Sequence, residues 1–259
     1  MASLSIRGVS KVYSTSDGPL AVIDNVSFEV ANGEFISIVG PSGCGKSTLL
    51  RMVAGLRTLS AGSIELDDVA VVKPTRVGMV FQAPALLPWR SALKNVMLAA
   101  ELAGWSSKEY EPHARSLLEL VGLGGFENRR IGELSGGMQQ RVALCRALLT
   151  ESTLLLMDEP FGALDALTRD EMNSELLRIW GAGGTKKTVL FVTHSIPEAV
   201  FLSDRVIVMS QRPAVISADV PIGLERPRTM EMRGSAQFGR QILQIYRVLE
   251  SGRPALAYD

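Results

Sequence analysis

The sequence is poor in cysteine, histidine and aromatic residues. It holds two cysteines, Cys44 and Cys145, and two histidines, and aromatic residues make up 6% of its 259 positions. The two cysteines lie about a hundred residues apart and neither has metal-ligand neighbours, so neither a disulfide framework nor a cysteine-based metal site is expected. The simple interpretation is a reduced, cytosolic chain.

The chain also lacks net charge and long apolar runs. Its 27 Lys and Arg residues balance 27 Asp and Glu residues, so no global field attracts a nucleic acid and no such partner is expected. No apolar run approaches the roughly 18 residues that a membrane span needs, and the N-terminus lacks the apolar segment of a secretion signal. We therefore expect a chain that is neither exported nor membrane-spanning, although a partner could hold it at a membrane.

Apolar and charged residues, at 46% and 21%, occur in the proportions of an ordinary globular protein. Apolar runs and partial alternation predict strands at residues 4–9, 22–30, 35–39, 62–66, 77–81, 154–157, 189–192 and 206–209. Helical spacing predicts helices at residues 47–56, 94–103, 108–121, 138–149, 167–180, 196–203 and 235–250. Residues 211–234, which include three prolines, are expected to form strand ends and loop.

The order of these elements predicts an α/β fold. Strands that alternate with helices favour a mostly parallel sheet covered on both faces. An antiparallel β region is expected at the N-terminus, and residues 83–150 are expected to form an inserted helical subdomain. We therefore predict one domain over residues 1–259, with a core of residues 1–82 and 151–234 and a C-terminal helix and tail at 235–259.

A glycine-rich loop follows the predicted strand at residues 35–39. Its sequence, GPSGCGKS, fits the phosphate-binding pattern G-x-x-x-x-G-K-[ST]. Glycines allow backbone N–H groups to approach phosphate oxygens, and the next helix directs its positive end at the same anion. Lys46 can reach the β- and γ-phosphates, and the Ser47 hydroxyl can bind Mg²⁺. The predicted nucleotide-binding residues here are Gly40, Pro41, Ser42, Gly43, Cys44, Gly45, Lys46, Ser47 and Thr48.

Two carboxylates follow the apolar run at residues 154–157. In parallel sheets the carboxyl ends of the strands are where ligands bind. Asp158 is expected to orient Mg²⁺, and Glu159 is expected to polarise the water that attacks the γ-phosphate. The plain alternative is a solvated strand end.

A third motif, LSGGM, opens the predicted helix at residues 138–149. Ser135 and the two glycines after it form a second helix N-terminus that could bind an anion. Taken alone, this segment is better explained as an ordinary helix N-cap.

The segments GPSGCGKST, LSGGMQQR, LLLMDEP, FGALD and VTHS follow one another along the chain. In this order they resemble the ATP-binding-cassette (ABC) ATPase family, and the resemblance extends from Ile6 to about Pro213. LSGG between the phosphate loop and the acidic strand is the most specific segment. The resemblance implies a fold of the P-loop NTPase type, with ATP and Mg²⁺ as ligands and ATP hydrolysis as the reaction.

The family's roles carry over by position. Tyr13 matches the aromatic residue that stacks on adenine, although it could be a plain strand-surface tyrosine. Gln82 matches the glutamine that contacts Mg²⁺ and the attacking water, and His194 matches the histidine at the γ-phosphate. Both could instead be polar residues at strand ends.

Other residues match positions that act across a dimer of cassettes. Ser135, Gly136 and Gly137 match the signature that closes on ATP held by the opposite subunit, and Asp165 matches a residue that communicates across the interface. The chain has one phosphate loop and one signature. The resemblance therefore implies a homodimer, or a heterodimer with a similar cassette.

Three classes of ABC protein are compatible with these motifs. Chromosome and repair ATPases carry long coiled coils between the phosphate loop and the acidic strand, and translation-associated proteins usually hold two cassettes. This chain has neither feature, so it resembles a transporter subunit. PALLPWRSALKNV and THSIPEAVFLSDRVIVMSQRP resemble a bacterial importer of the nitrate, sulfonate and taurine group. A different importer, an exporter or a soluble ABC ATPase is the alternative.

The importer resemblance implies partners and a location. Two copies of the chain would join two transmembrane permease subunits and, indirectly, a solute-binding protein. The chain would sit peripherally on the cytoplasmic side of the bacterial inner membrane. Leu86, Leu87, Pro88 and Trp89 form an apolar cluster that either meets a permease helix or joins two parts of the chain.

Overall fold

The structure is a computed structural model. It describes residues 3–67, 69–70, 77–150, 152–162, 164–182 and 187–251. The expected tail after residue 251 therefore lies outside the described residues. None of the described helices is long and apolar enough to cross a membrane.

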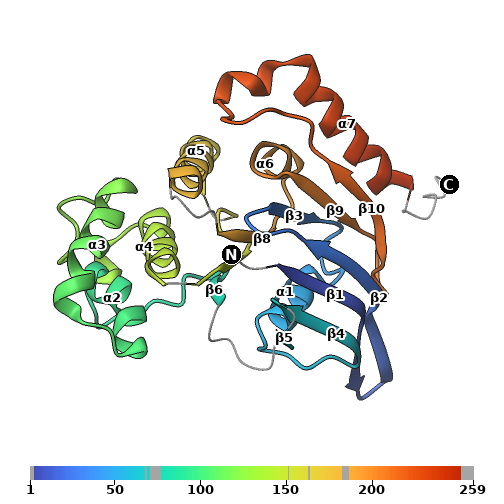
Figure 1. The fold of residues 1–259 in the computed structure, drawn as a ribbon, viewed down its shortest axis with the longest axis horizontal. Helices are drawn as coiled ribbons and strands as arrows, with labels where there is room; N and C mark the ends of the chain where they lie inside the picture. Colours follow the sequence, from blue (N-terminus) through green and yellow to red (C-terminus); the bar gives the residue numbers. More distant parts are fainter. Residues whose placement is uncertain are drawn as a thin grey trace.

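A six-stranded sheet forms the centre of the molecule (Figure 1). Its strand order is β10-β9-β3-β8-β7-β6, and the strands span Phe35–Val39 (β3), Val77–Val80 (β6), Leu154–Asp158 (β7), Thr188–Val192 (β8), Arg205–Met209 (β9) and Ile216–Pro221 (β10). All neighbours pair in parallel except β10, which runs antiparallel to β9. Every residue of β3, β7 and β8 is buried, as expected for parallel strands covered on both faces.

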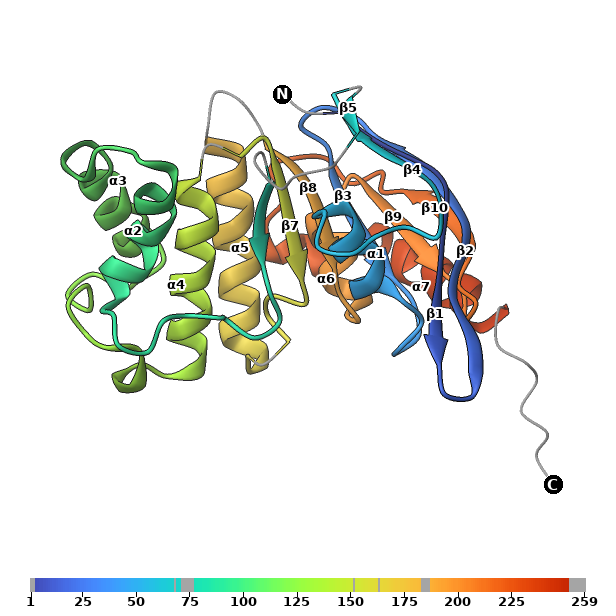
Figure 2. The same ribbon diagram turned by 90° about the horizontal axis from the view of Figure 1, so that it is seen from below.

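A second, antiparallel sheet has the order β2-β1-β4-β5. Its strands span Leu4–Thr15 (β1), Gly18–Val30 (β2), Ala61–Leu66 (β4) and Val69–Ala70 (β5). Helix α1 (Lys46–Val53) lies between this sheet and the central one, as Figure 2 shows. Leu49 and Leu50 of α1 share one apolar cluster with Ile6 of β1 and Ile36 of β3, so burial of these side chains joins the two sheets.

Residues 83–150 form a helical region at one end of the molecule (Figure 2). It contains α2 (Ala92–Ala103), α3 (Ser107–Leu120), the short 3₁₀ helix η1 (Ile131–Glu133) and α4 (Gly136–Leu149). These helices surround an apolar cluster of their own, which includes Val96, Leu118 and Val142. Ser91 begins α2 by accepting the backbone N–H of Lys94, as an N-cap serine does.

Three further helices cover the central sheet on the side away from α1. They are α5 (Ala166–Ala182), α6 (Ile196–Leu202) and α7 (Ala236–Ser251), and the short 3₁₀ helix η2 (Met230–Gly234) precedes α7. Phe238 and Ile245 of α7 are buried in the same cluster as Phe201 of α6. Figure 1 shows α7 on the outer side of α6 and β10.

The predicted α/β class, with its mostly parallel sheet, N-terminal antiparallel region and inserted helices, is confirmed. Several local predictions were wrong. Strand β1 runs to Thr15 rather than to residue 9, and β2 begins at Gly18 rather than at residue 22. Helix α1 ends at Val53 rather than at residue 56, because Gly55 takes a left-handed φ of 68° that ends the helix. Residues 216–221 form strand β10, since an edge strand tolerates the proline at its end.

Candidate active site

The phosphate loop joins β3 to α1 through a backbone that requires glycine. Gly45 caps α1 with φ 125°, a conformation that L residues rarely adopt. A Cβ atom at Gly45 would lie 3.0 Å from Val22 Cγ1, and one at Gly40 would lie 2.8 Å from the Met209 carbonyl oxygen. The glycines therefore allow the loop to pass closely between β2 and β9.

Lys46 lies across this loop at the start of α1. Its ammonium group donates to the carbonyl oxygens of Gly40 at 2.9 Å and Pro41 at 3.0 Å. The side chain is only 6% exposed. A positive charge is thus held beside the backbone N–H groups of a helix N-terminus, an arrangement that binds anions.

Ser47 and Asp158 meet at the other side of the loop. The Ser47 hydroxyl donates to Asp158 Oδ1 at 2.7 Å, and Asp158 is only 2% exposed. Burial raises the pKa of the Asp158 carboxyl, and the hydrogen bond from Ser47 and the charge of Arg51 oppose that rise. A hydroxyl and a carboxylate oxygen side by side are the hard ligands that Mg²⁺ prefers.

The predicted catalytic side chains converge on Glu159. Gln82, two residues after β6, donates its Nε2 to Glu159 Oε2 at 3.4 Å. His194, two residues after β8, places its Nδ1 3.2 Å from the same oxygen. Glu159 follows β7 in a left-handed conformation, with φ 46°, and its backbone N–H donates to the Val192 carbonyl at 2.9 Å. The carboxyl ends of three neighbouring strands therefore build one constellation.

A cavity of about 520 Å³ opens over the phosphate loop. Its lining comprises Tyr13, Leu20, Val22, Ser42, Gly43, Gly45, Lys46, Ser47, Thr48, Gln82, Glu159 and Arg212. Tyr13 lies on β1, and the ammonium group of Lys11 is 5.0 Å from the centre of its ring. The cavity thus offers an aromatic side chain at one side and cationic and N–H groups at the other, which suits a nucleotide.

Arg212 is the charged lining residue that sequence reasoning missed, and Leu20 and Val22 are apolar lining residues that it also missed. The Arg212 NH2 atom would lie 3.8 Å from a Cβ placed on Gly43. The loop that carries it is brought over the phosphate loop because Ala214 exchanges backbone hydrogen bonds with Val22 and Asp24, at 2.9 and 3.0 Å. A pairing of segments almost 200 residues apart leaves no local signal in a sequence.

The signature residues are not part of this cavity. Its described lining includes none of Ser135, Gly136, Gly137 and Asp165. Both views place α4, which begins after Ser135, across the strands from α1 (Figures 1 and 2). Within one copy, the structure therefore separates the phosphate loop from the signature.

Ser135 and Asp165 each cap a helix. The Ser135 hydroxyl accepts the backbone N–H of Met138 at 3.3 Å, and Asp165 Oδ1 accepts that of Thr168 at 3.0 Å. This hydrogen bond lowers the pKa of the Asp165 carboxyl. Both side chains are exposed, so a second molecule could contact them even though each caps a helix.

Known proteins resemble this chain along most of its length. The family model described as ABC transporter matches residues 23–162. An uncharacterized ABC transporter ATP-binding protein of Methanocaldococcus jannaschii is 45% identical over 245 residues, which cover 94% of this chain and 91% of that protein. An aliphatic sulfonates import ATP-binding protein of Bacillus thuringiensis subsp. konkukian is 42% identical over 245 residues, covering 94% and 96%. A taurine import ATP-binding protein of Burkholderia pseudomallei is 46% identical over 219 residues, covering 84% of each chain.

A solved structure has the same architecture. The ATP-binding cassette MJ0796, in a dimeric post-hydrolysis state with ADP and Pi, gives a TM-score of 0.76 at 30% identity. The match covers 86% of this chain and 100% of that one. Motifs, cavity and relatives agree: the chain belongs to the ABC transporter family and is an ATP-binding, ATP-hydrolysing subunit.

Proposed function

We propose that this chain powers an importer as one of two cassettes that close on ATP. The observation that carries the proposal is the divided site: one copy holds a complete phosphate loop, while its signature residues lie elsewhere. A second copy, turned to face the first, would bring Ser135, Gly136 and Gly137 to the γ-phosphate. MJ0796, which this chain resembles, has a structure solved as a dimer.

In this proposal the cavity binds ATP through residues along its whole length. Tyr13 stacks on adenine, and the loop from Gly40 to Thr48 surrounds the phosphates. The Lys46 ammonium group turns from the loop carbonyls towards the β- and γ-phosphates. Arg212, which lines the cavity, adds a second positive charge.

The residues around Asp158 fit a magnesium ion. Ser47, Asp158 and Gln82 supply a hydroxyl, a carboxylate and an amide, which are hard oxygen ligands. No group of three or more His, Cys, Asp or Glu side chains that could hold a metal occurs in the described ranges, so phosphate oxygens and water would complete the shell. When bound, Mg²⁺ neutralises charge on the phosphates.

Glu159 is the proposed base for hydrolysis. Its carboxylate would accept a hydrogen bond from the attacking water and take up its proton as the water oxygen bonds to the γ-phosphorus. The bond from that phosphorus to the β,γ-bridging oxygen would break in the same step, so that ADP leaves and inorganic phosphate forms. Gln82 and His194, both within 3.4 Å of Glu159 Oε2, would orient the water and hold the γ-phosphate. Asp165 would lie at the dimer interface and couple the two ATP-binding sites.

The proposed division of the chain follows from these roles. Residues 1–82 and 151–234 would act as the catalytic core, residues 83–150 as the subdomain that carries the signature, and residues 235–259 as a C-terminal helix and tail. The signature subdomain has its own apolar cluster, which supports movement as a unit when ATP binds.

The segment that includes Trp89 is the proposed contact with a membrane subunit. Leu86 packs against the helical cluster, whereas Trp89 is 71% exposed. Exposed tryptophans are common anchors at protein interfaces. Two permease subunits would bind two copies of the chain at the cytoplasmic face of the inner membrane.

The transported solute is proposed to be a small anion. The relatives are named for the import of sulfonates, taurine and bicarbonate, and nitrate importers belong to the group that the sequence resembles. Vesicles that hold the chain with its membrane subunits should take up one of these labelled anions when ATP is supplied. Uptake of none of them would refute the proposed solute class.

A mixing experiment tests the divided site. Lys46→Ala removes the phosphate-loop charge, and Gly136→Asp puts a negative charge into the signature. A Cβ at Gly136 meets nothing within 4 Å, so the second variant keeps its fold. Each variant alone should be inactive. An equal mixture should regain about a quarter of the wild-type rate, since half of the dimers are mixed and each of these has one complete site.

The matched control is Gly132→Asp, because Gly132 also has open space around it but lies outside the signature. It should hydrolyse ATP at the wild-type rate. A mixture no more active than its two components would contradict the divided site.

A further inference from the structure

His194 lies in a turn whose two flanking residues are tied to one glutamate. The Thr193 hydroxyl donates to Glu198 Oε2, and the same hydroxyl oxygen accepts the backbone N–H of Ser195 at 3.0 Å. The Ser195 hydroxyl in turn accepts the backbone N–H of Glu198 at 3.4 Å. Glu198 is therefore hydrogen-bonded to both neighbours of His194, Thr193 and Ser195.

Glu198 is a buried ionisable group that the proposed chemistry does not use. It is 4% exposed, and burial raises the pKa of its carboxyl, while the hydrogen bond from Thr193 and the charges of Arg169 and His194 oppose the rise. Its other oxygen, Oε1, has no hydrogen-bond partner among the described residues. Burying a carboxyl group costs free energy of folding, so a structural or functional role is expected for Glu198.

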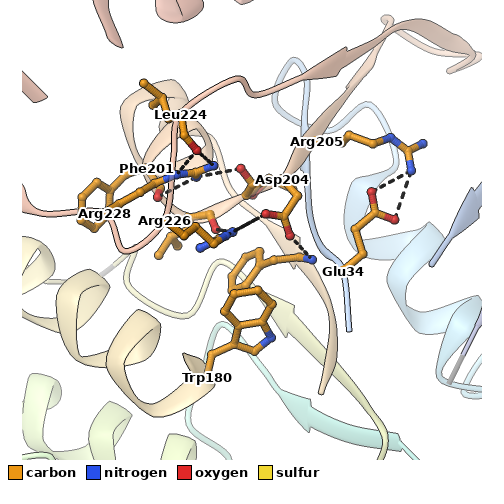
Figure 3. Close-up of polar contacts among 12 residues, drawn as sticks. Glu34, Trp180, Phe201, Asp204, Arg205, Leu224, Arg226 and Arg228 are labelled. Atoms are coloured by element: carbon orange, nitrogen blue, oxygen red, sulfur yellow. Dashed lines mark hydrogen bonds and ion pairs between the residues drawn. The ribbon is translucent and has the colours of Figure 1, made fainter. Parts of the chain in front are cut away.

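The far end of α6 is fixed by two arginines, as Figure 3 shows. Arg228 donates to the carbonyl oxygens of Val200, Phe201 and Ser203 at 3.0, 3.0 and 2.7 Å. Arg226 donates to the carbonyl oxygen of Leu202 at 2.7 Å. These four carbonyls lie at the end of a helix of seven residues, where the helix itself supplies no donors. Because α6 is held in place there, its first turn is a fixed support for the turn around His194.

Glu198 also faces α5, the helix that begins after Asp165. The charge of Arg169 on α5 lowers the pKa of Glu198, against the larger rise that burial causes. The Arg169 NH2 group donates to the Leu164 carbonyl oxygen at 2.8 Å. Glu198 thus lies where the segment around Asp165 meets the turn that holds His194.

We propose that Glu198 is a positioning residue for His194. Its carboxyl group fixes the Thr193–Ser195 turn so that the imidazole Nδ1 stays 3.2 Å from Glu159 Oε2. Glu198 is not among the residues that line the cavity, and it acts through His194 alone. This inference rests on the proposed role of His194 at the γ-phosphate.

Three substitutions separate positioning from simple stabilisation. Glu198→Ala and Thr193→Val each remove the bond that holds the turn, and each should lower kcat for ATP by roughly ten- to a hundredfold, since small misplacements are that costly. KM for ATP should stay unchanged, because the phosphate loop is untouched. Glu198→Gln keeps an acceptor oxygen for Thr193 and should restore kcat to within about threefold of wild type.

The decisive comparison repeats Glu198→Ala in a His194→Ala background. If Glu198 acts through His194, the second substitution causes no further loss of kcat. An equal loss in both backgrounds would overturn the inference. So would a wild-type kcat in Glu198→Ala when His194→Ala is inactive, and in that case the role of His194 itself stands. A wild-type kcat in His194→Ala would instead refute the proposed role of His194, and the inference with it.

Imidazole NMR spectra give a readout that does not depend on activity. The chain has two histidines, so His194→Ala assigns the His194 signals. Glu198→Ala and Thr193→Val should shift those signals, and unshifted signals would overturn the inference. Ser203→Ala is the matched control, because it removes a buried hydrogen bond with Ser37 at the opposite end of α6. It should leave both the signals and kcat as in the wild type.

Discussion

Replacing Arg228 with methionine should destabilise the fold far more than the loss of a surface ion pair does. Arg228 is 8% exposed, and its guanidinium group binds the backbone carbonyls of Val200, Phe201, Ser203 and Leu224. Burial lowers the pKa of Arg228 to about 10, so the group is still charged at neutral pH.

The size of the effect follows from the carbonyls that lose their donor. Methionine fills a similar volume but has no N–H group, so three carbonyls at the end of α6 and the carbonyl of Leu224 are left without this partner. An unsatisfied buried polar group costs about 1 kcal/mol or more. We therefore expect Arg228→Met to lower the free energy of unfolding by about 4 kcal/mol. Arg228→Lys should recover part of this loss, because an ammonium group reaches some of the same oxygens.

Urea unfolding followed by circular dichroism measures this difference. The matched control is Arg178→Met, whose side chain is 54% exposed and pairs with Glu175 at 2.5 Å. Exposed ion pairs contribute less than about 1 kcal/mol, so the control should unfold almost as the wild type does. If Arg228→Met also lies within about 1 kcal/mol of the wild type, Arg228 does not fix α6.

Three further predictions concern binding, pH and partners. Lys46→Ala should lose most of its affinity for ATP in a titration calorimeter, because the phosphates lose a direct charge; normal affinity would count against the phosphate-loop assignment. Burial raises the pKa of Glu198 above its unfolded value, so its stabilising contribution is present below the unfolded pKa and is lost as pH rises through the folded pKa. Glu198→Gln should therefore gain stability relative to the wild type as the pH rises above the ordinary pKa of a glutamate, and a difference in urea unfolding that stays constant over that rise would contradict this. Trp89→Ala should unfold as the wild type does, since the side chain is 71% exposed, but it should fail to co-purify with the membrane subunits; retained binding would place the contact elsewhere.

The sequence predicts the central strands and the phosphate loop well, because the residues within each of these segments determine its structure. FISIV at β3 and the first four residues of LLLMD at β7 place apolar side chains on both faces of the sheet, so the composition of these runs predicts buried parallel strands. The loop motif fixes its own geometry, because only glycine tolerates the φ of 125° at Gly45. The clustering of Gln82, Glu159 and His194 follows from strand ends that share one sheet edge.

Long-range contacts are what the sequence does not reveal. Arg212 reaches the cavity because residue 214 pairs with β2, and Arg228 reaches α6 from a segment that follows strands β9 and β10. Neither contact depends on a local pattern. Strand β10 was also missed, because the three prolines of residues 211–234 favoured a loop, while its antiparallel pairing with β9 decided the outcome.

The most direct test of the central claim is the size of the Glu159→Gln protein with and without Mg²⁺-ATP, measured by light scattering. This substitution removes the proposed base but leaves the phosphate loop and the signature intact. The account predicts a monomer without nucleotide and a stable dimer with ATP, because two divided sites close on two nucleotides and hydrolysis no longer releases them. A variant that hydrolyses ATP at the wild-type rate, or one that binds ATP and stays monomeric at every concentration, would contradict the account.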